Sequence, residues 1–288
     1  LLLIALGLAV CYRANVWNIG AEGQFVLGAI AAGGVALLAD KTTGPWIIPL
    51  ILLAGILGGM LWAGIVALLR DRFNASEILV SLMLVYVADL VLSYLVYGPW
   101  KDPNGYNFPQ TKNFEKVTQI PRLFDGTRMN VGLLIALFGV FGMWIYMFRT
   151  FIGFQLQVGG LAPHAARYAG FSSRRALWTA LLVSGGMAGL AGGLEVAGPI
   201  GQLTPYVPAG YGFAAIIVAF VGRLHPVGIV FSAILMSMFY IGGELAQSRL
   251  GLPKSLTGVF QGLLLFTLLA CDTLIAYRIK PSAKAGSK

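Results

Sequence analysis

Residues 15–25 read NVWNIGAEGQF and interrupt an otherwise apolar start of the chain. The run LLLIALGLAV (residues 1–10) precedes this segment, and FVLGAIAAGGVALLA (residues 25–39) follows it. The segment brings two asparagines, a carboxylate at Glu22, a glutamine and two glycines into this apolar setting. Two interpretations are open: a turn between two buried helices, or a functional break at or inside a membrane.

The composition of the whole chain indicates a membrane setting. Of its 288 residues, 58% are hydrophobic and 11% are charged, and the mean hydropathy is +0.80. Soluble chains carry about a quarter charged residues, so this chain has too few charges to cover a soluble surface. The 38 glycines suit close packing of helices within a membrane. The sequence therefore predicts an all-α polytopic membrane protein.

Nine apolar runs are visible along the chain, and a spanning helix needs about 20 apolar residues. Because the first run is short, we expect one more span before Leu1 and about ten transmembrane helices in the full chain. The run at 211–221 is too short to cross alone, which indicates that some helices are short or broken. The runs are residues 1–12, 25–39, 46–69, 78–98, 131–148, 176–197, 211–221, 226–243 and 255–277.

Lys and Arg residues set the expected orientation, because cytoplasmic loops carry an excess of them. If the spans alternate across the membrane, the majority of the 20 Lys and Arg residues fall on the side that holds the C-terminal tail. We therefore predict a multi-pass protein with a cytoplasmic C-terminus. The expected plan is a single transmembrane domain over residues 1–279, with an extracytoplasmic loop at about 99–130 and a cytoplasmic loop at about 150–175, and then a basic tail at 280–288. The outer loop is interpreted as an ordered cap or docking loop, with a plain connector as the alternative.

Several kinds of chemistry have no motif in this sequence. The net charge of +9 is spread through short gaps between apolar runs, which argues against binding to nucleic acid. Neither a GxxxxGKS/T phosphate loop nor a GxSxG nucleophile elbow occurs. His164 and His225 stand apart, and Cys11 and Cys271 have no metal or disulfide spacing. We therefore expect a chain without an enzymatic site, a cofactor or a metal of its own.

Polar residues recur along the run 78–98 and just before it. They are Glu77, Ser81, Asp89, Ser93 and Tyr97, which are 4, 8, 4 and 4 residues apart. At 3.6 residues per turn, this spacing places them on one slowly drifting face of a helix. Ionisable groups inside a membrane usually have a function, so we expect this face to line the protein interior or a water-filled path. Polar contact between helices is the alternative.

The cytoplasmic segment GFQLQVGGLAPHAARYAGFSSRR, residues 153–175, contains a second distinctive element. Residues 162–169 are predicted to form one short helix, because Pro163 suits a first turn and Gly170 suits a stop. A helix this short is marginal on its own. We expect it to dock on another protein, and a loop lying on its own helices is the alternative.

Three strings carry a resemblance to a known family: NIGAEGQFVLGA (18–29), PHAARYAGFSSRRA (163–176) and GYGFAAIIVAFVGRLHPVGIV (210–230). Together they resemble the membrane subunits of bacterial ABC importers of the branched-chain amino acid and ribose type, in the simple-sugar or nucleoside branch. The resemblance implies a permease in the bacterial inner membrane that works with a second permease chain, identical or related. It also implies cytoplasmic ATPase subunits that bind ATP and Mg, and a periplasmic or lipid-anchored solute-binding protein.

The resemblance assigns residues to two sites. The short helix becomes the coupling helix that contacts the ATPase, and a further set of residues becomes the candidate translocation path. The coupling residues are Pro163, Ala166, Arg167, Tyr168 and Gly170, and the path residues are Asn18, Glu22, Gln24, Glu77, Ser81, Tyr86 and Asp89. The family often has Asn immediately before the Tyr that corresponds to Tyr86, whereas this chain has Val85 there. That departure bears on which solute is recognised.

The function implied is inward movement of nucleosides or related sugar-bearing solutes by alternating access, energised by the separate ATPases. Within this class the alternative solutes are other simple sugars or branched-chain amino acids. A different class of function is an ion-coupled secondary transporter with broken helices at NIGAEGQ and at 211–221. In that reading Asp89 and Glu22 bind protons.

Overall fold

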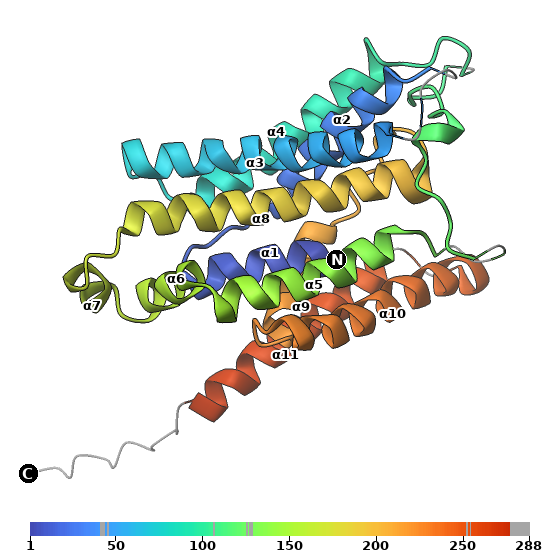
Figure 1. Cartoon of the computed structure of the whole chain (residues 1–288). Helices are drawn as coiled ribbons and strands as arrows, with labels where there is room; N and C mark the ends of the chain where they lie inside the picture. The colour runs from blue at the N-terminus through green and yellow to red at the C-terminus, as the bar shows by residue number, and fades with distance from the viewer. Residues whose placement is uncertain are drawn as a thin grey trace, which may run out of the picture. The chain divides into compact units, whose positions relative to one another are not determined.

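The computed structural model describes residues 1–276 apart from 41–43, 45, 106, 125, 127, 128, 252 and 254. Over these residues the backbone forms helices and connecting loops and no β-strand (Figure 1), which confirms the predicted all-α class. The predicted basic tail at 280–288 lies outside the described residues. The elements are α1 (Leu2–Arg13), α2 (Ala21–Leu37), α3 (Ile47–Phe73), α4 (Glu77–Tyr97), the 3₁₀ turn η1 (Lys116–Thr118), α5 (Gly132–Arg149), α6 (Phe151–Leu161), α7 (Pro163–Tyr168), α8 (Ser173–Glu195), the π-helical turn η2 (Val196–Ile200), α9 (Tyr211–Val221), α10 (Pro226–Leu250) and α11 (Ser255–Ala276).

Five helices in the described part of the chain are long and apolar enough to cross a membrane. They are α3, α4, α5, α8 continued through η2, and α10. Shorter apolar helices, α1, α2, α6 and α9, accompany them. This inventory confirms the prediction of a polytopic membrane protein in which some helices are short.

Helix α8 lies among α1, α2 and α3, with α3 and α1 on either side of it in Figure 1. Glycines make the close approach possible. A Cβ placed at Gly59 would lie 2.1 Å from the carbonyl oxygen of Gly185, and one placed at Gly189 would lie 2.1 Å from that of Gly55. The four glycines recur every fourth residue on the facing sides of antiparallel α3 and α8, so the two backbones are in direct contact.

The loop between α4 and α5 is hydrogen-bonded to the chain that follows α8. Backbone amides of Thr111, Phe114 and Ile120 donate to the carbonyls of Leu203, Gly201 and Ala197, at 3.0, 2.8 and 2.9 Å. The Leu203 amide returns a bond of 2.9 Å to the Thr111 hydroxyl. The loop is therefore fixed over η2 and the segment after it. A docking role for this loop stays a prediction.

The chain divides into two compact units, the first spanning Leu1–Ile234 and the second beginning at Leu235. The first unit contains α1 to α9 and the start of α10, and it holds every residue predicted for the path and for coupling. The second contains the rest of α10 and α11. The single domain predicted for residues 1–279 stays a prediction.

Candidate functional site

The segment NVWNIGAEGQF is a non-helical link, because α1 ends at Arg13 and α2 begins at Ala21. Asn15 takes a left-handed conformation (φ 57°) just after α1, and this conformation turns the chain out of the helix. Asn18 then points inward and is fully buried. The helical pattern is therefore interrupted here, and within the link Asn18 and Gly20 are buried whereas Asn15 and Trp17 are exposed.

A buried set of four side chains, Asn18, Gln24, Ser81 and Ser184, forms what we call the polar junction. The amides of Asn18 and Gln24 bond reciprocally, at 3.0 and 3.1 Å, and Asn18 also donates to the Ser184 hydroxyl at 3.0 Å. The Gly20 amide donates to the Asn18 side-chain oxygen at 3.1 Å, and the Ile19 amide donates to the Ser81 hydroxyl at 3.3 Å. The junction therefore ties the link to α2, α4 and α8. As solute contacts, Asn18, Gln24 and Ser81 stay predictions.

Glu22 lies in the first turn of α2, and only 2% of its surface is exposed. Its carboxylate accepts hydrogen bonds from the backbone amides of Gly210, at 2.8 Å, and of Gly212, where α9 begins. A negative charge at this position is stabilised by the free N–H groups and the dipole of the helix start. Glu22 therefore caps α9.

Both glycines at this contact are required by the geometry. Gly210 has a φ of 78°, a left-handed conformation that side chains disfavour. A Cβ at Gly212 would lie 2.2 Å from the backbone nitrogen of Glu22, so the starts of α2 and α9 touch. The sequence analysis missed this pairing, which joins residues about 190 positions apart. The signal was the pair of glycines around Tyr211 in GYG.

The residues predicted along α4 occupy different environments. Glu77 forms an ion pair with Arg70 of α3 at 3.1 Å, across the turn between the two helices. Asp89 is half-buried, and its Oδ1 is enclosed without a hydrogen-bond partner. Tyr86 is exposed, as is Tyr97. The structure therefore places Glu77 in an ion pair at the start of the helix and leaves Asp89 on its partly buried side without a partner for Oδ1.

Helix α7 confirms the predicted short helix at 162–169. Pro163 lies in its first turn, and Gly170 takes a left-handed conformation (φ 78°) after its end. Of its side chains Ala166 is buried, whereas Arg167 is exposed and Tyr168 is 98% exposed. Arg167 and Tyr168 therefore face outward. The helix itself lies beyond the end of α6 and the start of α8 (Figure 1).

The chain on either side of α7 holds it in place. The Phe171 amide donates to the Ala166 carbonyl at 2.9 Å, and its ring meets those of Phe151 and Phe154 edge-on, 5.9 and 6.3 Å away. At the start of α8, Arg174 pairs with Asp71 of α3 at 2.7 Å. Contacts therefore run from α7 and the residues after it to α6, and from the start of α8 to α3.

Helix α6 was not predicted, because the segment before Pro163 was interpreted as a loop. The Thr150 hydroxyl caps α6 by accepting from the Gly153 amide at 3.1 Å, and it donates to the Tyr146 carbonyl of α5 at 2.6 Å. A Cβ at Gly153 would lie 2.3 Å from that same carbonyl oxygen. A Thr followed by a glycine three residues later was the available signal for this corner.

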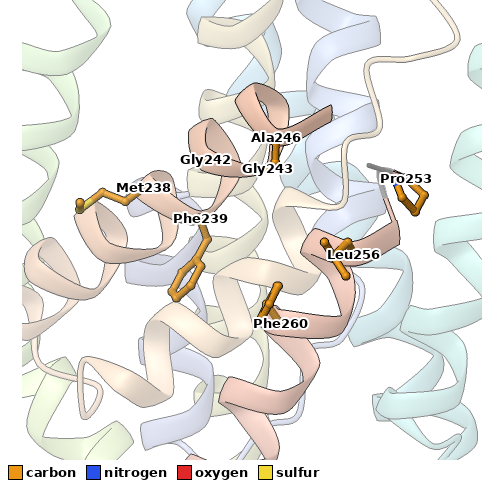
Figure 2. A pocket seen from close by; sticks show the side chains of 8 residues that line it. All are labelled: Met238, Phe239, Gly242, Gly243, Ala246, Pro253, Leu256 and Phe260. Atoms are coloured by element: carbon orange, nitrogen blue, oxygen red, sulfur yellow. The ribbon is translucent and has the colours of Figure 1, made fainter. Parts of the chain in front are cut away.

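A pocket in the second unit is lined by none of the predicted site residues. It has a volume of about 240 Å³ and lies between α10 and α11 (Figure 2). Its lining is hydrocarbon, without the convergent polar groups of a solute site. The lining residues are Met238, Phe239, Gly242, Gly243, Ala246, Pro253, Leu256 and Phe260.

Comparison with known proteins places these features in a family. The model of the family described as "Branched-chain amino acid transport system / permease component" matches residues 1–269. A glucose ABC transporter permease protein of Haloferax volcanii is 34% identical in an alignment that covers 96% of this chain and 76% of the relative. A guanosine ABC transporter permease protein of Bacillus subtilis is 31% identical in an alignment that covers 90% of this chain and 74% of the relative.

A third relative is a nucleoside ABC transporter permease protein of Lactococcus lactis, which is 29% identical in an alignment that covers 99% of this chain and 80% of the relative. No solved structure matches the chain significantly. All three relatives are named as permeases, which are transport components. The chain therefore belongs to the branched-chain amino acid transport system permease family and is an ABC transporter permease.

Proposed function

We propose that this chain forms one half of the membrane path of an ATP-driven importer for nucleosides or related sugar-bearing solutes. Relatives named for guanosine and nucleosides support this solute class, and the relative named for glucose keeps simple sugars as the alternative. The family description keeps branched-chain amino acids as a further alternative. The proposed setting is the bacterial inner membrane, with the C-terminus in the cytoplasm.

The proposed partners divide the work. A second permease chain completes the path, a periplasmic or lipid-anchored binding protein delivers the solute, and cytoplasmic ATPase subunits bind ATP and Mg. The observation that carries this proposal is the exposure of Arg167 and Tyr168 on α7. This short helix is held to α6 by the contacts of Phe171. Arg and Tyr are the side chains that most often anchor protein interfaces.

The mechanism that follows is alternating access. Closure of the ATPases pushes on α7, and the Asp71–Arg174 ion pair and the Phe171 ring cluster pass this movement to α3, α6 and α8. Because α3 and α8 are in backbone contact, they move as one body. The permease half then tilts and opens the path to the opposite side.

The test is charge reversal at α7 in the complete transporter. Arg167→Glu is expected to reduce solute uptake and recovery of the ATPase with this chain by at least about tenfold, because a buried interface charge of the wrong sign costs several kcal/mol. The matched control is Arg249→Glu, which reverses an exposed charge in the last turn of α10, in the second unit and outside both predicted sites. Unchanged uptake and ATPase recovery in Arg167→Glu would contradict the proposal.

A further inference from the structure

The exposed face of α4 differs from those of α3 and α5. Along α3 and α5, the large side chains exposed before the last turn are Leu, Ile and Phe. Near the middle of α4, by contrast, Tyr86 is 60% exposed. Tyrosine is enriched where a bilayer meets water, and a hydroxyl held in hydrocarbon has no partner. Met83, Val87 and Leu90 around it are exposed and apolar, so Tyr86 places a hydroxyl that needs a polar partner within an otherwise apolar face.

Four residues of α4 continue this polar character, and we call them the α4 polar stripe: Tyr86, Asp89, Ser93 and Tyr97. They are 3, 4 and 4 residues apart, a spacing that places them on one side of a helix. Tyr86 and Tyr97 are exposed, and Asp89 and Ser93 are half-buried. The stripe thus runs along the border between the packed and the exposed side of α4.

Asp89 lacks the partners that a carboxylate in a membrane needs. Its Oδ1 is buried without a hydrogen bond, and no ion pair to it is present among the described residues. The Glu22 carboxylate likewise acts as an acceptor, from the backbone amides of Gly210 and Gly212. Leaving a carboxylate unpaired in such a place is costly, so a donor from outside this chain is expected.

The side chains of the polar junction, unlike Asp89, have no hydrogen-bonding group free for a solute. Asn18 and Gln24 are buried and use their amide groups on each other, on Ser184 and on the backbone. A solute can bond to them only after these bonds break. Among the predicted path residues, Tyr86 and Asp89 therefore have the groups that are free to meet a solute.

We infer that the α4 polar stripe is the part of the path wall that recognises a nucleoside, with Tyr86 stacking on the base and Asp89 accepting from the sugar hydroxyls. This inference rests on the proposed function. An aromatic ring provides a planar face for any base, and stacking on it is tolerant of base identity. Residues three apart on a helix are neighbours, so one solute spans both groups. A branched-chain amino acid has no planar ring that could stack on Tyr86, so the stripe favours a nucleoside over it.

The test measures uptake of labelled guanosine and uridine by the complete transporter, with free ribose and glucose as competitors. Tyr86→Leu is expected to lower nucleoside uptake efficiency roughly tenfold, since stacking contributes about that factor per base. Tyr86→Phe keeps the ring and is expected to retain most of the uptake. Asp89→Asn removes the charge without changing the shape and is expected to raise the KM several-fold, because bonds to a charged acceptor are about twice as strong as neutral ones.

The matched control is Phe141→Leu, which removes a ring of similar exposure (58%) from the hydrocarbon face of α5 and is expected to leave uptake unchanged. If Tyr86→Leu and Asp89→Asn take up nucleosides like the unmodified transporter while Arg167→Glu abolishes uptake, the stripe is not the recognition site and the proposed function stands. Equal loss in Tyr86→Leu and Tyr86→Phe, or competition by free sugars as strong as by nucleosides, would also overturn the inference. Full uptake in Arg167→Glu would instead contradict the proposed function, on which the inference depends.

Discussion

At the scale of single residues, Glu22 changes most between sequence and structure. Its sequence context suggested a group that lines the solute path. In the structure both carboxylate oxygens are engaged by the amides of Gly210 and Gly212, inside protein. The charge thus closes the start of α9, a short helix whose first amides would otherwise lack partners. Glu22 shapes the bundle through this cap.

A pair of variants separates this capping role from a role of the charge in transport. Glu22→Leu removes the acceptors of two buried amides, and each unsatisfied group costs about 1–3 kcal/mol, so the thermal unfolding midpoint of the purified transporter is expected to fall. Glu22→Gln keeps one side-chain oxygen as an acceptor and is expected to lose less stability and to retain most of the uptake. Glu115→Gln is the control, because Glu115 makes only an exposed contact of 4.0 Å with Lys112. An inactive Glu22→Gln with an unchanged midpoint would contradict the capping account.

At the scale of elements, the contact between α3 and α8 organises the first unit. It depends on glycines because the two backbones touch, and a methyl group has no space between them. In a membrane, where lipid is as apolar as Leu, this close packing is the principal source of helix association. The two helices also meet at the Asp71–Arg174 ion pair beside α7. The α3–α8 pair therefore connects the start of α8, which follows α7, with the glycine contact in the packed interior of the first unit.

Alanine substitutions test this contact. In Gly189→Ala the new Cβ meets the Gly55 carbonyl at 2.1 Å and the Gly59 Cα at 2.9 Å, so backbone must shift, at a cost of about 1–3 kcal/mol. The expected result is a lower unfolding midpoint in detergent. Gly142→Ala is the matched control, because nothing lies within 4 Å of its Cβ and alanine favours a helix. Equal midpoints for the two variants would contradict the packing account.

The long elements could be predicted from sequence, because a membrane helix is marked by its own apolar run. The run at 46–69 became α3 (Ile47–Phe73), and the run at 78–98 became α4 (Glu77–Tyr97). Helix α6 escaped prediction because glutamines and a glycine pair resemble a loop when only local signals are used. The bond from Glu22 to the start of α9 escaped for a different reason: a contact between distant residues leaves no local pattern. The exposure of Tyr168 likewise depends on how α6 turns at Thr150.

At the scale of the whole molecule, the first unit separates three tasks. The α4 polar stripe runs along the border between the packed and the exposed side of α4, the polar junction and Glu22 fix the inner helices, and α7 projects at one end of the bundle. The chain belongs to a permease family, so the energy for transport comes from other subunits. The competing view, an ion-coupled transporter, draws on the same two carboxylates. In the structure Glu22 is already hydrogen-bonded, and that view therefore depends on Asp89 alone.

The most direct measurement is uptake of a labelled nucleoside into proteoliposomes, comparing the complete transporter supplied with ATP and the purified chain alone under a proton or sodium gradient. The account predicts uptake that requires the ATPase subunits and ATP hydrolysis and is abolished by Arg167→Glu. It also predicts that an ion gradient without ATP produces no accumulation in either preparation. Accumulation of the nucleoside by this chain alone, driven by an ion gradient, would contradict the account.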